Sequence, residues 1–264
     1  MIINSKKISI ISHIKILRQH IIRSLCSIIL LVIILMFNKE IIFDKILFGP
    51  IKNNFITYRI INKINNTKNF SQNIKIINRK ILGQFNIYMF VCLSGGFIIS
   101  FPYICYELWK FIKPGLTIKE QKFYRLIIIS SYVLFSLGIL FGYFLLSPMI
   151  IQFGDNFKIS DIPQNVFDLC DYISTIIKST LYMGIVFLFP IFAFVLTKLG
   201  VITPQLLHNY KKHAILIILI IASAITPGDI INTIVAIIPI IFLYQISVFI
   251  VSLVYNEKKL LNRN

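Results

Sequence analysis

The ionisable side chains that could do chemistry in this chain are few, and they lie close to long apolar runs. Glu120 stands in a basic loop with Lys119 and Lys122. A carboxylate in this position either binds a cationic group from outside, for which a guanidinium is the best geometric match, or pairs with a neighbouring lysine at little gain in stability. Glu107, near the end of an apolar run, is either an interfacial residue or a second acidic contact.

Two further ionisable residues fall within the apolar second half of the chain. Lys178 lies inside an apolar run, where a charged residue is a functional candidate by default. It is only six residues past Tyr172, however, so its amine could also extend to the membrane surface. Asp229 closes a Thr-Pro-Gly-Asp turn, where it either caps the next helix or contributes to a polar functional site.

Metal, redox and catalytic chemistry are not indicated. The four cysteines form no CxxC pair, and three lie in apolar runs, which is typical of small buried hydrophobes. His13 and His20 lie in a basic segment without a convergent Asp or Cys, so we expect no metal site there. The sequence contains no phosphate-binding loop and no catalytic triad. We therefore expect neither an enzyme nor a bound cofactor.

Composition determines the class of protein that must position these residues. Hydrophobic residues make up 57% of the 264 positions, charged residues only 14%, and the mean hydropathy is +0.82. So few charges cannot cover a soluble surface of this size. The net charge of +17 comes from basic residues in loops between apolar runs, which is the pattern of membrane topology signals and lipid contacts and not of a nucleic-acid-binding face.

Hydropathy predicts an all-α, polytopic membrane protein of about six helices, forming a single membrane domain over 1–264. A span needs about 20 apolar residues, and a Pro-Gly-Asp turn divides the last apolar stretch into two short spans. The predicted spans are 24–37, 87–109, 126–146, 172–196, 214–225 and 231–254, with a long loop at 38–86. Loop charges place both termini on the inner side, although the basic long loop departs from that rule.

Several motifs occur in a fixed order along residues 12–250. They include His13-Ile14-Lys15-Ile16-Leu17-Arg18, Trp109-Lys110-Phe111-Ile112-Lys113-Pro114-Gly115-Leu116 followed by Glu120, Phe141-Gly142-Tyr143, Leu199-Gly200-Val201-Ile202-Thr203, and Thr226-Pro227-Gly228-Asp229. Together they resemble the TatC family, the core subunit of the twin-arginine protein translocase. Singly each motif is weak, but their order and their placement between spans fit that family.

This resemblance implies a receptor for the twin-arginine signal peptides of folded precursors. It places signal-peptide binding at Glu120, Arg18 and Glu107. Pro114, Gly115, Asp229 and Lys178 are candidates for structural or translocation roles. The implied partners are single-span subunits of the TatA and TatB type, membrane lipids and further copies of the chain, with energy supplied by the transmembrane proton gradient.

The sequence departs from the family pattern at three acidic positions. Ile16, Leu188 and Gln245 stand where the family has Glu. The strong excess of Ile over Ala indicates an AT-biased gene, as in organelles and reduced endosymbionts. We expect a divergent, organelle-encoded member in the mitochondrial inner membrane, with a plastid thylakoid or a bacterial inner membrane as further options.

Two other functions remain open on the sequence alone. A structural subunit of an organellar respiratory complex would have a similar apolar composition. A small secondary transporter would need polar residues spread through its spans, preferably repeated in two halves, and the chain shows no internal repeat.

Overall fold

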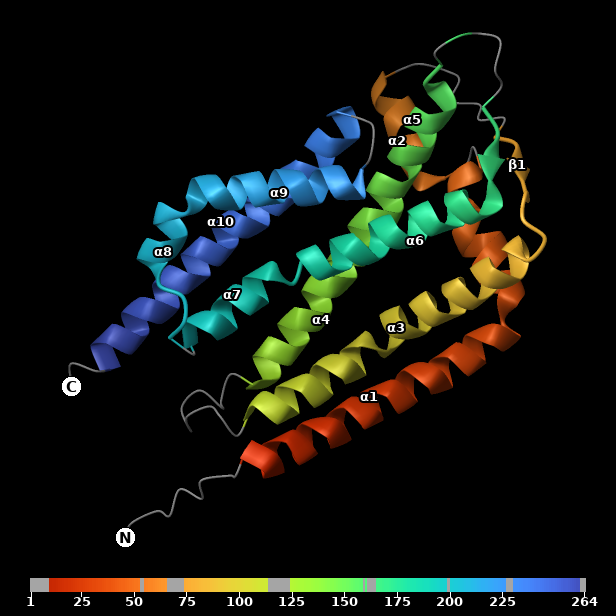
Figure 1. Ribbon diagram of the computed structural model, residues 1–264. Coiled ribbons are helices and arrows are strands. Elements are labelled where there is room, and N and C mark those ends of the chain that lie inside the picture. The colour runs from red at the N-terminus through yellow and green to blue at the C-terminus, as the bar shows by residue number, and fades with distance from the viewer. Residues whose placement is uncertain are drawn as a thin grey trace. The chain divides into compact units, whose positions relative to one another are not determined.

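A computed structural model of the chain describes residues 10–52, 55–65, 74–113, 124–158, 160, 165–198, 200–226 and 230–261 (Figure 1). The chain forms two compact units. The first comprises residues 1–39 and 89–132, and the second comprises residues 40–88 and 133–264. The first unit carries Arg18 and Glu107, and the second carries Lys178.

The first unit is built on two long helices, α1 (Ile10–Phe37) and α3 (Gly83–Ile112), of which residues 83–88 belong to the second unit. Helix α1 begins 14 residues before the predicted start at Ser24, because Ile14, Leu17 and Ile21 already follow helical spacing within the basic segment. The two helices approach closely at Gly96, where a Cβ would lie 2.6 Å from Val32 Cγ2 and 3.2 Å from the Val32 backbone nitrogen. The glycine therefore sets the spacing between α1 and α3.

The second unit begins with the segment predicted as a long loop, which is largely ordered. It contains the π-helical turn η1 (Ile41–Leu47), the 3₁₀ turn η2 (Gly49–Ile51), the amphipathic helix α2 (Ile56–Asn65) and strand β1 (Ile76–Ile77). Two tyrosine hydroxyls hold this segment in place. The Tyr172 hydroxyl donates to the Leu47 carbonyl at 3.0 Å, and the Tyr143 hydroxyl donates to that of Ile46 at 2.6 Å.

The next part of the chain forms two long helices, each interrupted once. Helix α4 (Tyr124–Phe141) continues through the π-helical turn η5 (Gly142–Leu146) into α5 (Ser147–Asn156), so this helix runs ten residues past the predicted span. Strand β2 (Phe167–Asp168) pairs in parallel with β1. Asp168 then caps α6 (Leu169–Val186) by accepting from the Cys170 amide at 2.9 Å. A break just before Pro190 separates α6 from α7 (Phe189–Lys198).

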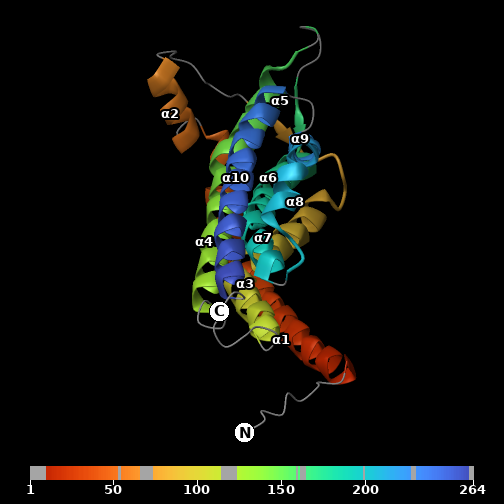
Figure 2. The same ribbon diagram turned by 90° about the vertical axis from the view of Figure 1, so that its left-hand side faces the viewer.

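The C-terminal part consists of α8 (Pro204–Asn209), α9 (Lys211–Ile225) and α10 (Ile230–Leu261). Figure 2 shows α8 and α9 lying along α10. The expectation that the last two helices are both short holds for α9, with 15 residues, but not for α10, which has 32. Pro239 lies inside α10 without ending it, and the apolar sequence continues to Tyr255.

Five described helices are long and apolar enough to cross a membrane. They are Ile14–Phe37, Gly83–Ile112, Arg125–Asn156, Leu169–Lys198 and Thr233–Tyr255. Helix α9 is apolar as well, but at 1.5 Å per residue it is only about 22 Å long, shorter than the hydrocarbon core of about 30 Å. The prediction of an all-helical, multi-pass membrane protein is confirmed, and the number of six spans is approximate.

Candidate functional site

A buried polar cluster joins α1 to α3 within the first unit. Glu107, in the last two turns of α3, is 2% exposed and is hydrogen-bonded through Oε2 to Nδ1 of His20 on α1. The second carboxylate oxygen, Oε1, accepts a hydrogen bond of 3.0 Å from the Tyr103 hydroxyl. Tyr103 and Glu107 are four residues apart on α3 and therefore share one helix face. Each carboxylate oxygen thus has a partner.

Aromatic rings border this cluster. The Phe111 ring lies edge-on to the His20 ring, with centroids 6.1 Å apart. One turn before Phe111, the Tyr106 ring faces the Lys110 amine, which lies 5.7 Å from its centroid. Such surroundings reduce the access of water to the pair and strengthen the electrostatic attraction within it. The cluster therefore ties the N-terminal half of α1 to the end of α3, and Glu120 follows Glu107 by 13 positions in the sequence.

Glu107 is the one predicted signal-contacting carboxylate that the structure describes. Its two oxygens are engaged by His20 and Tyr103. Arg18 is exposed on α1, two residues before His20. Lys178 is exposed on α6, ten residues into that helix. Glu120, Pro114, Gly115 and Asp229 lie outside the described residues.

No pattern in the sequence identified His20 as a partner for Glu107. The two residues are separated by 87 positions, and no local spacing relates positions on different helices. The only signal was a carboxylate near the end of an apolar run, which needs a hydrogen-bonding partner when the fold buries it. No cluster of three or more His, Cys, Asp or Glu side chains that could hold a metal occurs among the described residues.

The three positions where family acidic residues are replaced have different surroundings. Ile16 is exposed on α1, and Gln245 is exposed on α10. Leu188 is buried at the break between α6 and α7. An apolar side chain at position 188 needs no partner there, whereas a carboxylate would need one.

Replacing Tyr103 by Phe tests the hydrogen bond to Glu107. Tyr103 is 40% exposed, so in the Phe variant a water molecule can take over the hydrogen bond to Glu107. We therefore expect a measurable loss of thermal stability that is smaller than the loss caused by replacing His20. Tyr106→Phe is the matched control, since Tyr106 is 41% exposed on the same helix and its ring faces Lys110. Equal effects of the two substitutions on the unfolding temperature in detergent would show that the Tyr103 hydroxyl has no special role.

Comparison with known proteins finds relatives that match most of the chain. The family model of the Sec-independent protein translocase protein (TatC) matches residues 12–239. The Sec-independent protein translocase protein TatC of Blattabacterium sp. subsp. Periplaneta americana (strain BPLAN) is 55% identical over 255 residues, which cover 94% of this chain and 96% of that relative. The TatC of Aquifex aeolicus (strain VF5) is 36% identical over 170 residues, covering 64% of this chain and 70% of that relative.

Solved structures agree. A crystal structure described as the twin-arginine translocase receptor TatC superposes with a TM-score of 0.72 at 30% identity, covering 92% of this chain and 99% of that one. A second, of the same receptor in DDM, gives a TM-score of 0.74 at 29% identity, covering 91% and 99%. These relatives give no support to a respiratory subunit or a secondary transporter. The chain belongs to the TatC family, and it is a subunit of the Sec-independent protein translocase.

Proposed function

We propose that this subunit receives twin-arginine signal peptides on the surface formed by the N-terminal half of α1 and the end of α3. The observation that carries the proposal is the buried His20–Glu107–Tyr103 cluster, which fixes these two segments against each other. A guanidinium pair needs acceptors held in a fixed geometry. The cluster supplies that rigidity next to exposed Arg18 and to the start of the loop with Glu120.

The residues of this site have different proposed roles. Glu120 accepts the signal guanidinium groups, while Glu107 orients α3 and the loop that follows it. Pro114 and Gly115 shape that loop, and Arg18 contributes to the same surface. Because Ile16 replaces a family Glu, Glu120 carries more of the arginine recognition here than in relatives that keep both acids.

Asp229 and Lys178 are proposed to act elsewhere in the chain. Asp229 is proposed either to cap the last helix or to take part in translocation. Lys178 is exposed on α6, where its long side chain can bring its amine to the membrane surface.

The same proposal extends to location and partners. The relatives named above are bacterial, so among the three membranes that the sequence left open, the bacterial inner membrane has the best support. The chain would form a single membrane domain with both termini on the cytoplasmic side. It would assemble with further copies of itself and with single-span subunits of the TatA and TatB type, and use the proton gradient to move folded precursors.

Site-specific photocrosslinking tests the receptor function. A photoreactive residue at position 120 or 18, in native membranes, is presented with a radiolabelled precursor carrying Arg-Arg or Lys-Lys in its signal. We expect crosslinks with Arg-Arg and a loss of most of them with Lys-Lys, because an ammonium cannot form the bidentate contacts of a guanidinium.

A photoreactive residue at Lys158, exposed after α5 in the second unit, is the control position and should give no signal-dependent crosslink. Crosslinks at position 120 that are indifferent to the arginines would remove Glu120 from arginine recognition. The absence of any precursor crosslink from membranes that contain intact protein would contradict the receptor function itself.

A further inference from the structure

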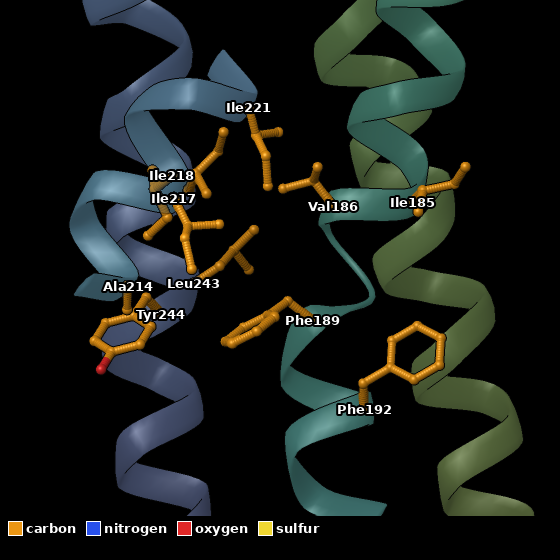
Figure 3. A pocket seen from close by; sticks show the side chains of 11 residues that line it. Ile185, Val186, Phe189, Phe192, Ala214, Ile217, Ile218, Ile221, Leu243 and Tyr244 are labelled. Atoms are coloured by element: carbon orange, nitrogen blue, oxygen red, sulfur yellow. The ribbon is translucent and has the colours of Figure 1, made fainter. Parts of the chain in front are cut away.

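A separate apolar cavity lies in the second unit, between α6, α7, α9 and α10. Figure 3 shows the side chains that line it, among them Phe189 and Phe192 from α7, Ala214 and Ile221 from α9, and Leu243 from α10. Its volume is about 330 Å³, within the range of roughly 300–1,000 Å³ that small-molecule sites occupy. The cavity is independent of the His20–Glu107 cluster, since none of its lining residues belongs to the first unit.

The interior of this cavity offers nothing to a polar ligand. Its one polar lining group is the Tyr244 hydroxyl, which donates a 2.8 Å hydrogen bond to the Leu207 carbonyl. A ligand carrying amide, hydroxyl or charged groups would lose its hydration there without compensation. The part of a ligand that occupies the cavity must therefore be a hydrocarbon.

One end of the cavity adjoins a group of cationic side chains. Ala214 lines the cavity at the start of α9, and Lys211, three residues earlier, lies on the same helix face. Lys212 and His213 follow directly, and all three residues are exposed. The sequence from 189 to 226 contains no Asp or Glu, so the charge at this end is of one sign and favours an anionic group.

The dimensions favour a single hydrocarbon chain over a helix. Ala214 and Ile221 line the cavity at positions seven residues apart, which is about 10 Å along α9. Spread over that length, 330 Å³ leaves a channel much narrower than an α-helix, which is about 10–12 Å across with its side chains.

We propose that this cavity is a specific binding site for an anionic glycerophospholipid. One acyl chain lies along Ala214, Ile218 and Ile221, and the phosphate is held at the exposed start of α9 by Lys211, Lys212 and His213. Lysines close to a membrane surface attract anionic headgroups. Unlike an ordinary basic loop, this site also has a cavity that holds the acyl chain of the lipid in a defined position.

Acyl-chain photolabelling of the full-length protein tests this proposal. The protein is placed in phosphatidylcholine nanodiscs that contain a minor fraction of either phosphatidylglycerol or phosphatidylcholine with a diazirine in the acyl chain. Labelled residues are then mapped by mass spectrometry. We expect labelling of Ile218 and Leu243 to be roughly thirtyfold higher with the glycerol headgroup, in line with the attraction of two lysines. Exposed Leu216 and Ile220 of α9 serve as an internal reference and should label equally with both lipids.

Two variants separate the headgroup site from the cavity. Lys211→Gln with Lys212→Gln should reduce phosphatidylglycerol labelling of the cavity to the phosphatidylcholine level. Lys75→Gln with Lys158→Gln, a matched pair of exposed lysines elsewhere in the unit, should leave it unchanged. Ala214→Leu should lower cavity labelling while labelling at Leu216 and Ile220 persists. An unfolding temperature in detergent close to that of the unaltered protein shows that this variant is still folded.

Equal labelling of the cavity by the two lipids in the unaltered protein would overturn the proposal. So would cavity residues that take no lipid label but crosslink to a single-span membrane protein in native membranes, since that would assign the cavity to a protein partner.

Discussion

Replacing His20 by Leu should destabilise the protein by about 3 kcal/mol or more, since it leaves the buried Glu107 carboxylate without its main partner. Glu107 is 2% exposed, and its remaining partner is the partly exposed Tyr103 hydroxyl. Without His20, one oxygen of the buried carboxylate has no hydrogen-bond donor. Either water must then enter the contact between α1 and α3, or the two helices must separate. Thermal unfolding of the purified protein in detergent measures the loss.

The double variant His20→Leu with Glu107→Leu is the informative control. Removing both polar groups also removes the desolvation penalty, so we expect stability to return to within about 1 kcal/mol of the unaltered protein. Additive losses in this double-mutant cycle would contradict the direct pairing of the two residues.

The same variants separate an effect on stability from an effect on signal-peptide binding. If the cluster positions the signal-binding surface, precursor crosslinking at position 120 should fall in His20→Leu and recover in the double variant along with stability. A double variant that is stable but does not recover crosslinking would instead assign Glu107 a direct contact with the signal peptide.

Replacing Gly138 or Gly142 by Ala should be strongly destabilising as well. The two glycines lie four residues apart and face α6, in the small-xxx-small arrangement that lets membrane helices approach closely. A Cβ at position 138 would lie 2.5 Å from the Met183 carbonyl oxygen, and one at position 142 would lie 2.7 Å from the Thr180 Cα. Backbone atoms cannot move aside as a side-chain end can, so the helices must separate. We expect a loss of about 1–3 kcal/mol for each substitution.

Gly154→Ala provides the matched control for these substitutions. A Cβ at position 154 meets only the Phe167 ring, at 3.1 and 3.3 Å, and that ring can shift by a small rotation. The unfolding temperature and the monodisperse fraction in size-exclusion chromatography should therefore stay close to those of the unaltered protein. A loss as large as that of Gly138→Ala would attribute the effect to glycine in helices generally and not to the contact with α6.

The sequence predicted the membrane class and the all-helical fold correctly, because these depend on local properties. Runs of apolar residues of sufficient length must cross as helices, whatever they pack against. The errors fell where local signals conflict. The start of α1 is basic but has helical apolar spacing, and α10 contains a proline that does not end it. Within the predicted loop at 38–86, the structure holds η1 through hydrogen bonds from Tyr143 and Tyr172, which lie far later in the chain.

The candidate site was predicted only in part. The resemblance to TatC pointed to Glu107 and Arg18. Glu107 falls within the predicted span 87–109, whereas Arg18 lies on α1 ahead of the predicted start at 24. The pairing of Glu107 with His20, however, depends on how two helices cross 87 positions apart in the chain, which no local spacing encodes. Likewise, the tight fit of Gly138 against Met183 is a property of two packed surfaces.

Composition and hydropathy by themselves determined that this chain spans a membrane as helices, since each segment must satisfy its own backbone hydrogen bonds within the hydrocarbon. Ordered motifs determined the family. The tertiary structure alone decided which polar groups are buried together, which glycines are irreplaceable, and where an apolar cavity adjoins a cationic surface. These features arise from contacts between segments distant in the sequence, and the free energy of such contacts depends on the geometry of packing and not on the identity of either residue alone.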